Sequence, residues 1–178
     1  YLAEALAKKH FPMAPAPGAA PPEVIVNLCG NVLRHSRMGD RVRDSLFAKA
    51  RLVVDVNFRL NETGRYCDFL LPAAGWYEKV GIKYIAAFVP YVTLGDRASA
   101  PLGEAKPEWE LFANLATHVS QAAQRRGIAS ARGFNGQDCA LDTLGARFTD
   151  DGRFGPDAQE AVTEFILSVS DATKGITL

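Results

Sequence analysis

The chain has 178 residues, of which 48% are hydrophobic and 22% are charged, and this composition is typical of a globular domain with one core. Twenty basic and twenty acidic residues cancel, which excludes the electrostatic footprint of a nucleic-acid-binding or acidic-membrane-binding protein. No apolar run approaches the ~18 residues of a spanning helix, so we expect no direct membrane insertion.

The first 22 residues are predicted to precede the domain proper. Residues 1–9 are rich in helix formers and indicate the end of a helix, whereas residues 11–22 contain five prolines and one glycine, which is typical of an extended connector. Because the chain begins at Tyr1 rather than at a methionine, we expect it to be a piece of a longer protein.

The next segment predicts a unit of strand, helix and strand. The run Val24–Leu28 indicates a strand, Asp40 is a plausible N-cap for a helix through Ala50, and Leu52–Val56 indicates a second buried strand. The spacing of about 30 residues matches a βαβ unit, in which the two strands are parallel neighbours. We therefore expect the strand tips at Asn31 and Asn57 to lie side by side at one edge of the sheet.

A third short strand and an unusual loop follow. The run from Phe69 to Leu71 ends at Pro72, which cannot donate to a sheet ladder. Ligands of open α/β sheets bind at the carboxyl ends of strands, so these closely spaced ends predict a binding edge. The loop of residues 73–81 begins with small residues and continues with aromatic and charged ones, which indicates a surface of defined shape. In residues 82–94, Pro90 favours edge strands or an irregular segment.

The second half predicts helices separated by glycines. Pro107 opens a helix that runs to about Arg126 with an apolar face. Asp138 could cap a helix through about Ala146, and Asp157 with Glu160 resembles a capping box at the start of a last helix.

Few side chains in the sequence suggest chemistry by themselves. Cys29, Cys67 and Cys139 form no CxxC pair or ligand cluster, which argues against a zinc or iron–sulfur site built from this chain alone. Asn31 and Asn57 could read a nucleobase edge or a ribose, although asparagine is also common at strand ends. Lys79, in a loop that ends in glycine, could meet a phosphate or a polarised carbonyl, and a solvated lysine is an equally good interpretation.

Several blocks of residues form a joint pattern that is more specific than any one of them. In chain order the blocks are Gly30-Asn31, Glu62-Thr63, Cys67-Asp68-Phe69-Leu70-Leu71-Pro72-Ala73-Ala74, Trp76-Tyr77-Glu78-Lys79-Val80-Gly81 and Pro101-Leu102-Gly103-Glu104-Ala105-Lys106-Pro107-Glu108-Trp109. Over residues 23–126 their order and spacing resemble the molybdopterin oxidoreductases of the dimethyl sulfoxide reductase family. Trp76-Tyr77, together with Phe58-Arg59, is most similar to the branch of nitrate, selenate, chlorate, ethylbenzene and dimethyl sulfide enzymes.

The resemblance implies a fold and a division of the chain. The expected fold is α/β, with a Rossmann-like parallel sheet, flanking helices and a mostly helical C-terminal appendage. Residues 1–22 would be a helix end and linker, residues 23–127 a molybdopterin-guanine-dinucleotide-binding domain, and residues 128–178 an extension toward the next domain. The branch also suggests a periplasmic or membrane-associated location.

The resemblance also implies a role for five residues in holding a bis(molybdopterin guanine dinucleotide) cofactor that carries molybdenum. Asn31 would meet the nucleotide, Val56 and Asn57 the guanine or ribose, Lys79 the pterin or a phosphate, and Glu108 the guanosine end. The family usually has an aspartate at the position of Asn57. An aspartate accepts two hydrogen bonds from the guanine N1–H and N2–H groups, whereas an asparagine can accept only with its amide oxygen, so this contact would be weakened or transferred to nearby Asp55.

The remaining expectations concern the parent protein. The family's molybdenum ligand and iron–sulfur cysteines lie outside the matched blocks, so the chain alone should have no turnover. Its implied partners are the other domains of the catalytic subunit and an iron–sulfur electron-transfer subunit. Two alternatives stay open at this point: an α/β scaffold or binding module that has lost the cofactor, and a stand-alone hydrolase or transferase, which the lack of a GxSxG or phosphate-loop motif disfavours.

Overall fold

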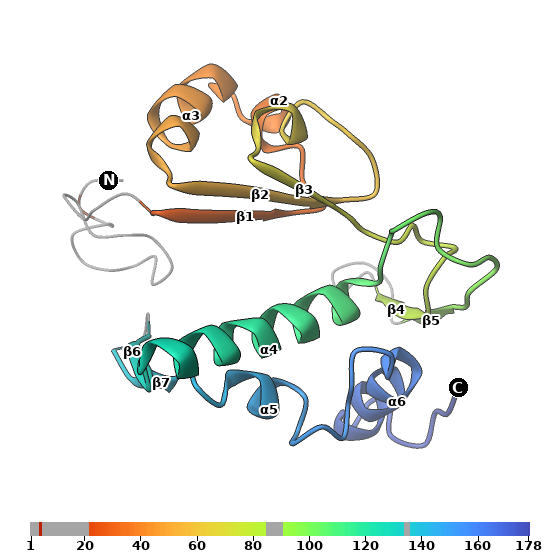
Figure 1. The fold of residues 1–178 in the computed structure, drawn as a ribbon. Helices are drawn as coiled ribbons and strands as arrows, with labels where there is room; N and C mark the ends of the chain where they lie inside the picture. The colour runs from red at the N-terminus through yellow and green to blue at the C-terminus, as the bar shows by residue number, and fades with distance from the viewer. Residues whose placement is uncertain (1–3, 5–21, 85–90, 134–135) are drawn as a thin grey trace. The chain divides into compact units, whose positions relative to one another are not determined.

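The computed structural model describes residues 4, 22–84, 91–133 and 136–178. The chain divides into two compact units, residues 1–71 and residues 72–178 (Figure 1). The predicted helix end and proline-rich linker lie outside the described residues, apart from Glu4 and Pro22.

The first unit is built on a three-stranded parallel sheet in the order β1-β2-β3. Its elements are β1 (Val24–Leu28), α2 (Val32–His35), α3 (Gly39–Ser45), η1 (Phe47–Lys49), β2 (Leu52–Asn57), η2 (Gly64–Tyr66) and β3 (Phe69–Pro72). Val24 pairs with Leu52, and the register continues to Leu28 opposite Val56. This confirms the predicted parallel neighbours and the α/β fold. In Figure 1 the helices α2 and α3 cover one face of this sheet.

The core of the first unit lies between these helices and the sheet. Leu33, Phe47 and Val53 are buried at its centre, and partly buried side chains surround them, namely Ile25, Val42, Leu46, Ala50 and Cys67. The predicted continuous helix from Asp40 to Ala50 is wrong in detail. The α-helix ends at Ser45 and the chain tightens into a 3-10 turn, which brings Phe47 into the core. Asp40 lies in the first helical turn and does not cap it.

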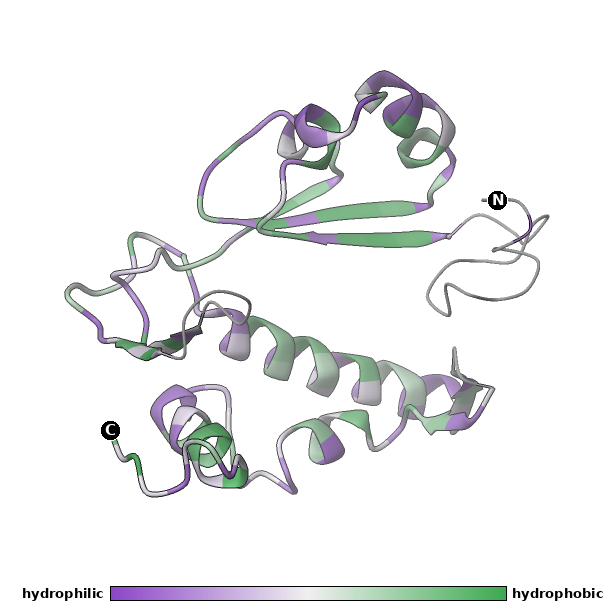
Figure 2. Ribbon diagram, turned by 180° about the vertical axis from the view of Figure 1, so that it is seen from behind, coloured by the Kyte–Doolittle hydropathy of each residue, from purple (hydrophilic) through white to green (hydrophobic). Residues whose placement is uncertain are grey.

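The other face of β1 is apolar and only partly covered. Val24, Val26 and Leu28 alternate with the inward-facing residues of the strand, and between 46% and 56% of their surface is exposed. Figure 2 shows that the strands of this sheet are coloured mainly as hydrophobic. A strand with apolar residues on both faces is typical of a parallel sheet that is packed on both sides.

The second unit is built around one long helix. Its elements are β4 (Gly81–Tyr84), β5 (Val92–Gly95), α4 (Glu108–Arg126), β6 (Ser130–Arg132), β7 (Asp138–Ala140), α5 (Leu144–Phe148) and α6 (Gln159–Val169). The predicted helix after Pro107 is confirmed, and it ends at Gly127, whose φ of 65° suits a residue without a Cβ. Gly145 in α5 touches α4 so closely that an added Cβ would lie 2.8 Å from the Cα of Thr117.

The second unit contains two short antiparallel strand pairs, one of which agrees with the prediction and one of which does not. β4 and β5 pair antiparallel, which agrees with the edge strands predicted near Pro90. The predicted helix from Asp138 is wrong, because residues 138–140 form β7 opposite β6 and the next helix begins only at Leu144. The predicted capping box is also wrong, since α6 begins after Ala158 with no side-chain cap.

Two further properties concern the described part of the chain. None of its helices is both long and apolar enough to cross a membrane. Within the same ranges, no three or more histidine, cysteine, aspartate or glutamate side chains are grouped so that they could hold a metal ion.

Candidate functional site

The carboxyl ends of β1 and β2 form a tightly bonded edge. The ladder extends one step beyond β1, where the backbone N–H of Cys29 donates to the carbonyl of Val56 at 2.9 Å. The carbonyl oxygen of Gly30 then accepts from three amide side chains: Asn27 at 2.9 Å, Asn57 at 3.3 Å and Asn61 at 3.3 Å. Three independent donors on one backbone oxygen fix the position of the turn that carries Asn31.

The buried carboxylate of Asp55 is hydrogen-bonded to one of these three asparagines. Asn27 Nδ2 donates to Asp55 Oδ1 at 2.6 Å as well as to the Gly30 carbonyl. Asp55 is fully buried, and its other oxygen, Oδ2, has no hydrogen-bond partner in the described part of the chain. The pair therefore links the middle of β2 to the tip of β1 inside the fold.

The side chain of Asn31 is held by one residue from the loop after β2. Asn31 Oδ1 accepts from the backbone N–H of Thr63 at 3.3 Å and from the Thr63 hydroxyl at 3.1 Å. The same hydroxyl accepts from the backbone N–H of Leu33 at 3.1 Å, and Thr63 is fully buried. Among the described residues Asn31 Nδ2 donates to no protein acceptor, although the residue is half-buried. Asn31 therefore presents an amide donor at the strand edge.

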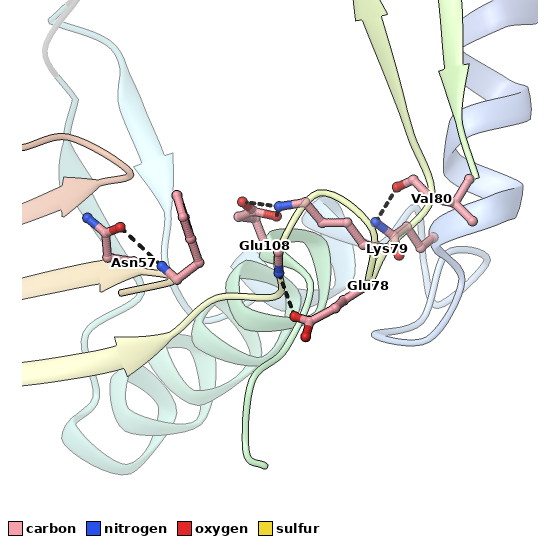
Figure 3. Close-up of polar contacts among 8 residues, drawn as sticks. Asn57, Glu78, Lys79, Val80 and Glu108 are labelled. Carbon is pink, nitrogen blue, oxygen red and sulfur yellow. Dashed lines mark hydrogen bonds and ion pairs between the residues drawn. The ribbon is translucent and has the colours of Figure 1, made fainter. Parts of the chain in front are cut away.

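The predicted guanine contacts, Val56 and Asn57, both lie inside the fold. Only 3% of the surface of Asn57 is exposed, and its Oδ1 accepts from the N–H of Phe58 at 3.1 Å (Figure 3). Its Nδ2 is the donor to Gly30 described above. Val56 is buried as well, and its carbonyl already accepts from Cys29. Both ends of the Asn57 amide are therefore used within the protein: Nδ2 joins the two strand tips, and Oδ1 bonds the backbone of the next residue.

In the second unit, Lys79 and Glu108 form an ion pair. Lys79 Nζ lies 2.5 Å from both carboxylate oxygens of Glu108, and the side chains are only 14% and 25% exposed (Figure 3). The ammonium group also lies 5.5 Å from the centre of the Trp76 ring, within the range of a cation–π contact. The two residues, predicted to meet different parts of one ligand, are therefore direct partners.

The loop that carries Lys79 is tied down on both sides. Glu78 Oε2 accepts from the backbone N–H of Gly75 at 2.7 Å, and Gln159 Nε2 in α6 donates to the carbonyl of Val80 at 2.5 Å (Figure 3). The start of α4 is joined to the same region, because Ala74 N–H donates to the carbonyl of Lys106 at 2.8 Å. These backbone contacts place Glu108 within reach of Lys79.

Cys67 lies beneath the first-unit edge and is a poor nucleophile. Burial, followed by the negative charges of Asp55 and Asp68, raises the pKa of its thiol to about 11. The thiol donates to the carbonyl of Thr63 at 3.2 Å. Since the reactive form of cysteine is the thiolate, Cys67 has a structural role at neutral pH.

The structure therefore brings the five predicted residues together in two groups. Asn31, Val56 and Asn57 share the strand edge of the first unit, and Lys79 and Glu108 form the pair in the second. That Lys79 shares a nucleotide cradle with the two asparagines stays a prediction.

Sequence reasoning gave no role to three residues that build the edge, Asn27, Asn61 and Thr63. Asn27 carried a usable signal, because it is a polar residue in the otherwise apolar run of β1.

The donor chemistry of the first-unit edge fits a ligand rich in acceptor atoms. Asn31 offers amide hydrogens at the carboxyl end of two parallel strands, which is where open α/β sheets bind nucleotides. Phosphate, ribose and nucleobase oxygens are suitable acceptors for an amide donor. The arrangement can bind and orient such a ligand.

Comparison with known proteins identifies the family to which the chain belongs. The family model described as "Molybdopterin oxidoreductase" matches residues 7–118. The chain is 34% identical, over its whole length, to 19% of the perchlorate reductase subunit alpha of Dechloromonas aromatica. It is 35% identical over 56% of its length to the respiratory nitrate reductase subunit alpha of Haloferax mediterranei, and 31% identical over 72% to the dimethylsulfide dehydrogenase subunit alpha of Rhodovulum sulfidophilum.

The chain spans only 10% of the nitrate reductase subunit and 14% of the dimethylsulfide dehydrogenase subunit. The match of the family model covers well over half of the chain. The resemblance seen in the blocks between Gly30 and Trp109 is thereby confirmed. The chain belongs to the molybdopterin oxidoreductase family, an enzyme family whose cofactor is a molybdopterin with molybdenum.

Proposed function

We propose that the chain is part of the catalytic subunit of a molybdenum-dependent oxidoreductase and binds one molybdopterin guanine dinucleotide of a bis(molybdopterin guanine dinucleotide) cofactor. The observation that carries the proposal is the Asn31 amide. Its oxygen is used by Thr63, while its Nδ2 is directed to no described protein acceptor at the carboxyl end of β1. Family membership supplies the ligand class that such a donor would meet.

Each of the other predicted residues has a role that suits its surroundings. Asn57 and Val56 hold the tip of β2 against the tip of β1 and shape the floor under the nucleotide. Lys79 has three ammonium hydrogens, and the two oxygens of Glu108 leave one of them for a phosphate or pterin oxygen. Glu108, in the first turn of α4, would reach the guanosine end once the ligand is in place.

The reaction itself would occur at the cofactor. When bound, the molybdenum centre supplies oxygen-atom or hydride-equivalent chemistry, and the protein supplies binding, orientation and electrostatics. In this proposal residues 23–127 form the cofactor-binding domain and residues 128–178 extend toward the next one. The molybdenum ligand and an iron–sulfur cluster belong to other parts of the parent subunit, an iron–sulfur subunit carries the electrons, and the chain alone has no turnover.

One observation favours a second candidate, an α/β scaffold that no longer binds the cofactor. Asn57 stands where the family usually has an aspartate, and its amide is satisfied within the protein by Gly30 and Phe58. A residue with 3% exposure and two protein partners has little capacity left for a guanine. In a scaffold, the network at the strand tips would serve stability alone.

The two candidates differ in what Asn31 does. We expect Asn31→Ala in the full-length protein to lower molybdenum and guanine nucleotide per polypeptide, measured by elemental mass spectrometry and by nucleotide release. Asn114→Ala, a half-buried asparagine of α4, is the matched control and should leave both unchanged. Full-length protein that contains neither molybdenum nor guanine nucleotide would support the scaffold instead.

A further inference from the structure

The orientation of the Asn31 amide is set by a directional chain of hydrogen bonds. The backbone N–H of Leu33 can only donate, so the Thr63 hydroxyl accepts from it, at 3.1 Å. The hydroxyl hydrogen is then available for Asn31 Oδ1, at 3.1 Å. The backbone N–H of Thr63 donates to the same oxygen at 3.3 Å.

Two donors on one side of the amide determine which atom lies there. If the amide were turned over, its NH₂ group would face the N–H of Thr63, and two donors would oppose each other. The oxygen must therefore face Thr63, and Nδ2 must point away from Thr63. Thr63 is fully buried and touches no solvent, so it cannot meet a ligand itself.

We infer that Thr63 is a positioning residue that makes Asn31 an obligatory hydrogen-bond donor, and hence that the ligand atom at Asn31 is an acceptor oxygen or nitrogen. The inference rests on the proposed function, because it concerns the same ligand. It goes further by naming the residue that sets the specificity and the polarity of the ligand atom. The fixed amide avoids the loss of rotamer freedom that a mobile asparagine would suffer on binding.

Two conservative substitutions at Thr63 separate the role of its hydroxyl from that of its methyl group. Thr63→Ser keeps the hydroxyl and removes one methyl group. Thr63→Val keeps the shape and removes the hydroxyl, which leaves the Leu33 N–H without its acceptor and Asn31 Oδ1 with one donor. Thr63→Ser therefore controls for the methyl group, and a loss confined to Thr63→Val is attributed to the hydroxyl.

The test is a double-mutant cycle in the full-length protein, with guanine nucleotide and molybdenum per polypeptide as readouts and the melting temperature recorded separately. We expect Thr63→Val and Asn31→Ala each to lower occupancy about fivefold, the size of one hydrogen bond, and Thr63→Ser to stay near wild type. In the Asn31→Ala background, Thr63→Val should lower occupancy no further, although its effect on the melting temperature persists. Equal losses in both backgrounds, or equal losses for the serine and valine variants, would overturn the positioning role.

A second variant keeps the inference testable if Thr63→Val does not fold. Asn31→Asp has the same shape and still accepts from Thr63, but it presents a negative acceptor at the edge where Nδ2 was. We expect its occupancy to fall at least as far as that of Asn31→Ala, with little change in melting temperature. Wild-type occupancy in Asn31→Asp would overturn the donor assignment. Wild-type occupancy in Asn31→Ala would instead show that Asn31 does not contact the cofactor at all. Failure of the donor assignment and failure of the proposed function therefore give different results.

Discussion

Lys79 and Glu108 are 29 residues apart in the chain, yet the ammonium nitrogen of the lysine lies 2.5 Å from both oxygens of the glutamate. The link between Ala74 and Lys106 brings the loop and the start of α4 together. Because the pair is largely shielded from solvent, each charge stabilises the other more strongly than in an exposed pair.

The first prediction concerns this pair. We expect Lys79→Ala to lower the free energy of unfolding by about 1–2 kcal/mol, since it removes the ion pair from a largely buried carboxylate. The control is Lys106→Ala, which breaks the more exposed pair between Lys106 and Glu110 and should cost less than about 0.5 kcal/mol. Urea denaturation followed by tryptophan fluorescence measures both. Equal effects of the two substitutions would contradict the prediction.

The same variant bears on the cofactor. In the full-length protein we expect Lys79→Ala to lower the molybdenum content, because the ammonium group is the cation proposed to meet a phosphate or pterin oxygen. The charge-swapped double variant, Lys79→Glu with Glu108→Lys, should recover stability relative to Lys79→Glu without recovering molybdenum. Unchanged molybdenum and activity in Lys79→Ala would exclude the cofactor role.

A second prediction concerns the residue that departs from the family pattern. Asn57→Asp would place a carboxylate oxygen against the carbonyl of Gly30, where the amide now donates. We expect a loss of about 1 kcal/mol or more in the free energy of unfolding, measured by denaturation of the purified chain. Asn57→Ala, which removes the donor without adding charge, serves as the comparison and should cost less. An Asn57→Asp chain as stable as wild type would show that this contact is unimportant.

The raised pKa of Cys67 gives a third prediction. The pKa of the folded thiol, about 11, exceeds the ordinary value of 9.0, so the folded state holds its proton more tightly than the unfolded state does. The contribution of this thiol to stability is therefore constant below about pH 9 and is lost as the pH rises from there toward 11. Melting temperatures between pH 8 and 11, compared with those of Cys67→Ala, measure this decline, which the alanine variant should show to a smaller extent. Parallel pH profiles in the two proteins would contradict it.

The fourth prediction tests the crossing of α2 and α3. A Cβ added at Gly39 would lie 1.9 Å from the carbonyl oxygen of Leu33, so one of the two helices must shift. We expect Gly39→Ala to lower the free energy of unfolding by about 1–3 kcal/mol or more through overpacking. Gly81→Ala, where an added Cβ meets nothing within 4 Å, is the control and should have a much smaller effect. Similar losses at both positions would argue against the close approach.

Much of the fold could be predicted because its signals are local. The β-branched runs of β1 and β2 and the proline at the start of α4 each specify their element within a few residues. The hairpin of β6 and β7 could not be predicted in this way. Its strands have three residues each, too few for a periodicity, and their pairing depends on contacts across the loop between them.

The site was predicted in part for a similar reason. The spacing of a βαβ unit was enough to place Asn31 and Asn57 at one edge. The spacing could not reveal that the Asn57 amide already makes hydrogen bonds to Gly30 and Phe58, since these bonds depend on side-chain directions at the turn. The pairing of Lys79 with Glu108 was equally inaccessible, because it requires the contact between Ala74 and Lys106.

The crowded carbonyl of Gly30 has a consequence for mutational tolerance. An oxygen with two lone pairs cannot bond three amides equally well, and the donor distances of 2.9, 3.3 and 3.3 Å show that Asn27 holds the best position. When either Asn57 or Asn61 alone is replaced by alanine, the amide of the other can move closer to the Gly30 carbonyl. The turn therefore tolerates the loss of one of these two donors. Asn27 also donates to the buried Asp55, a contact that neither of the other two makes, so the turn is most sensitive to substitution at Asn27.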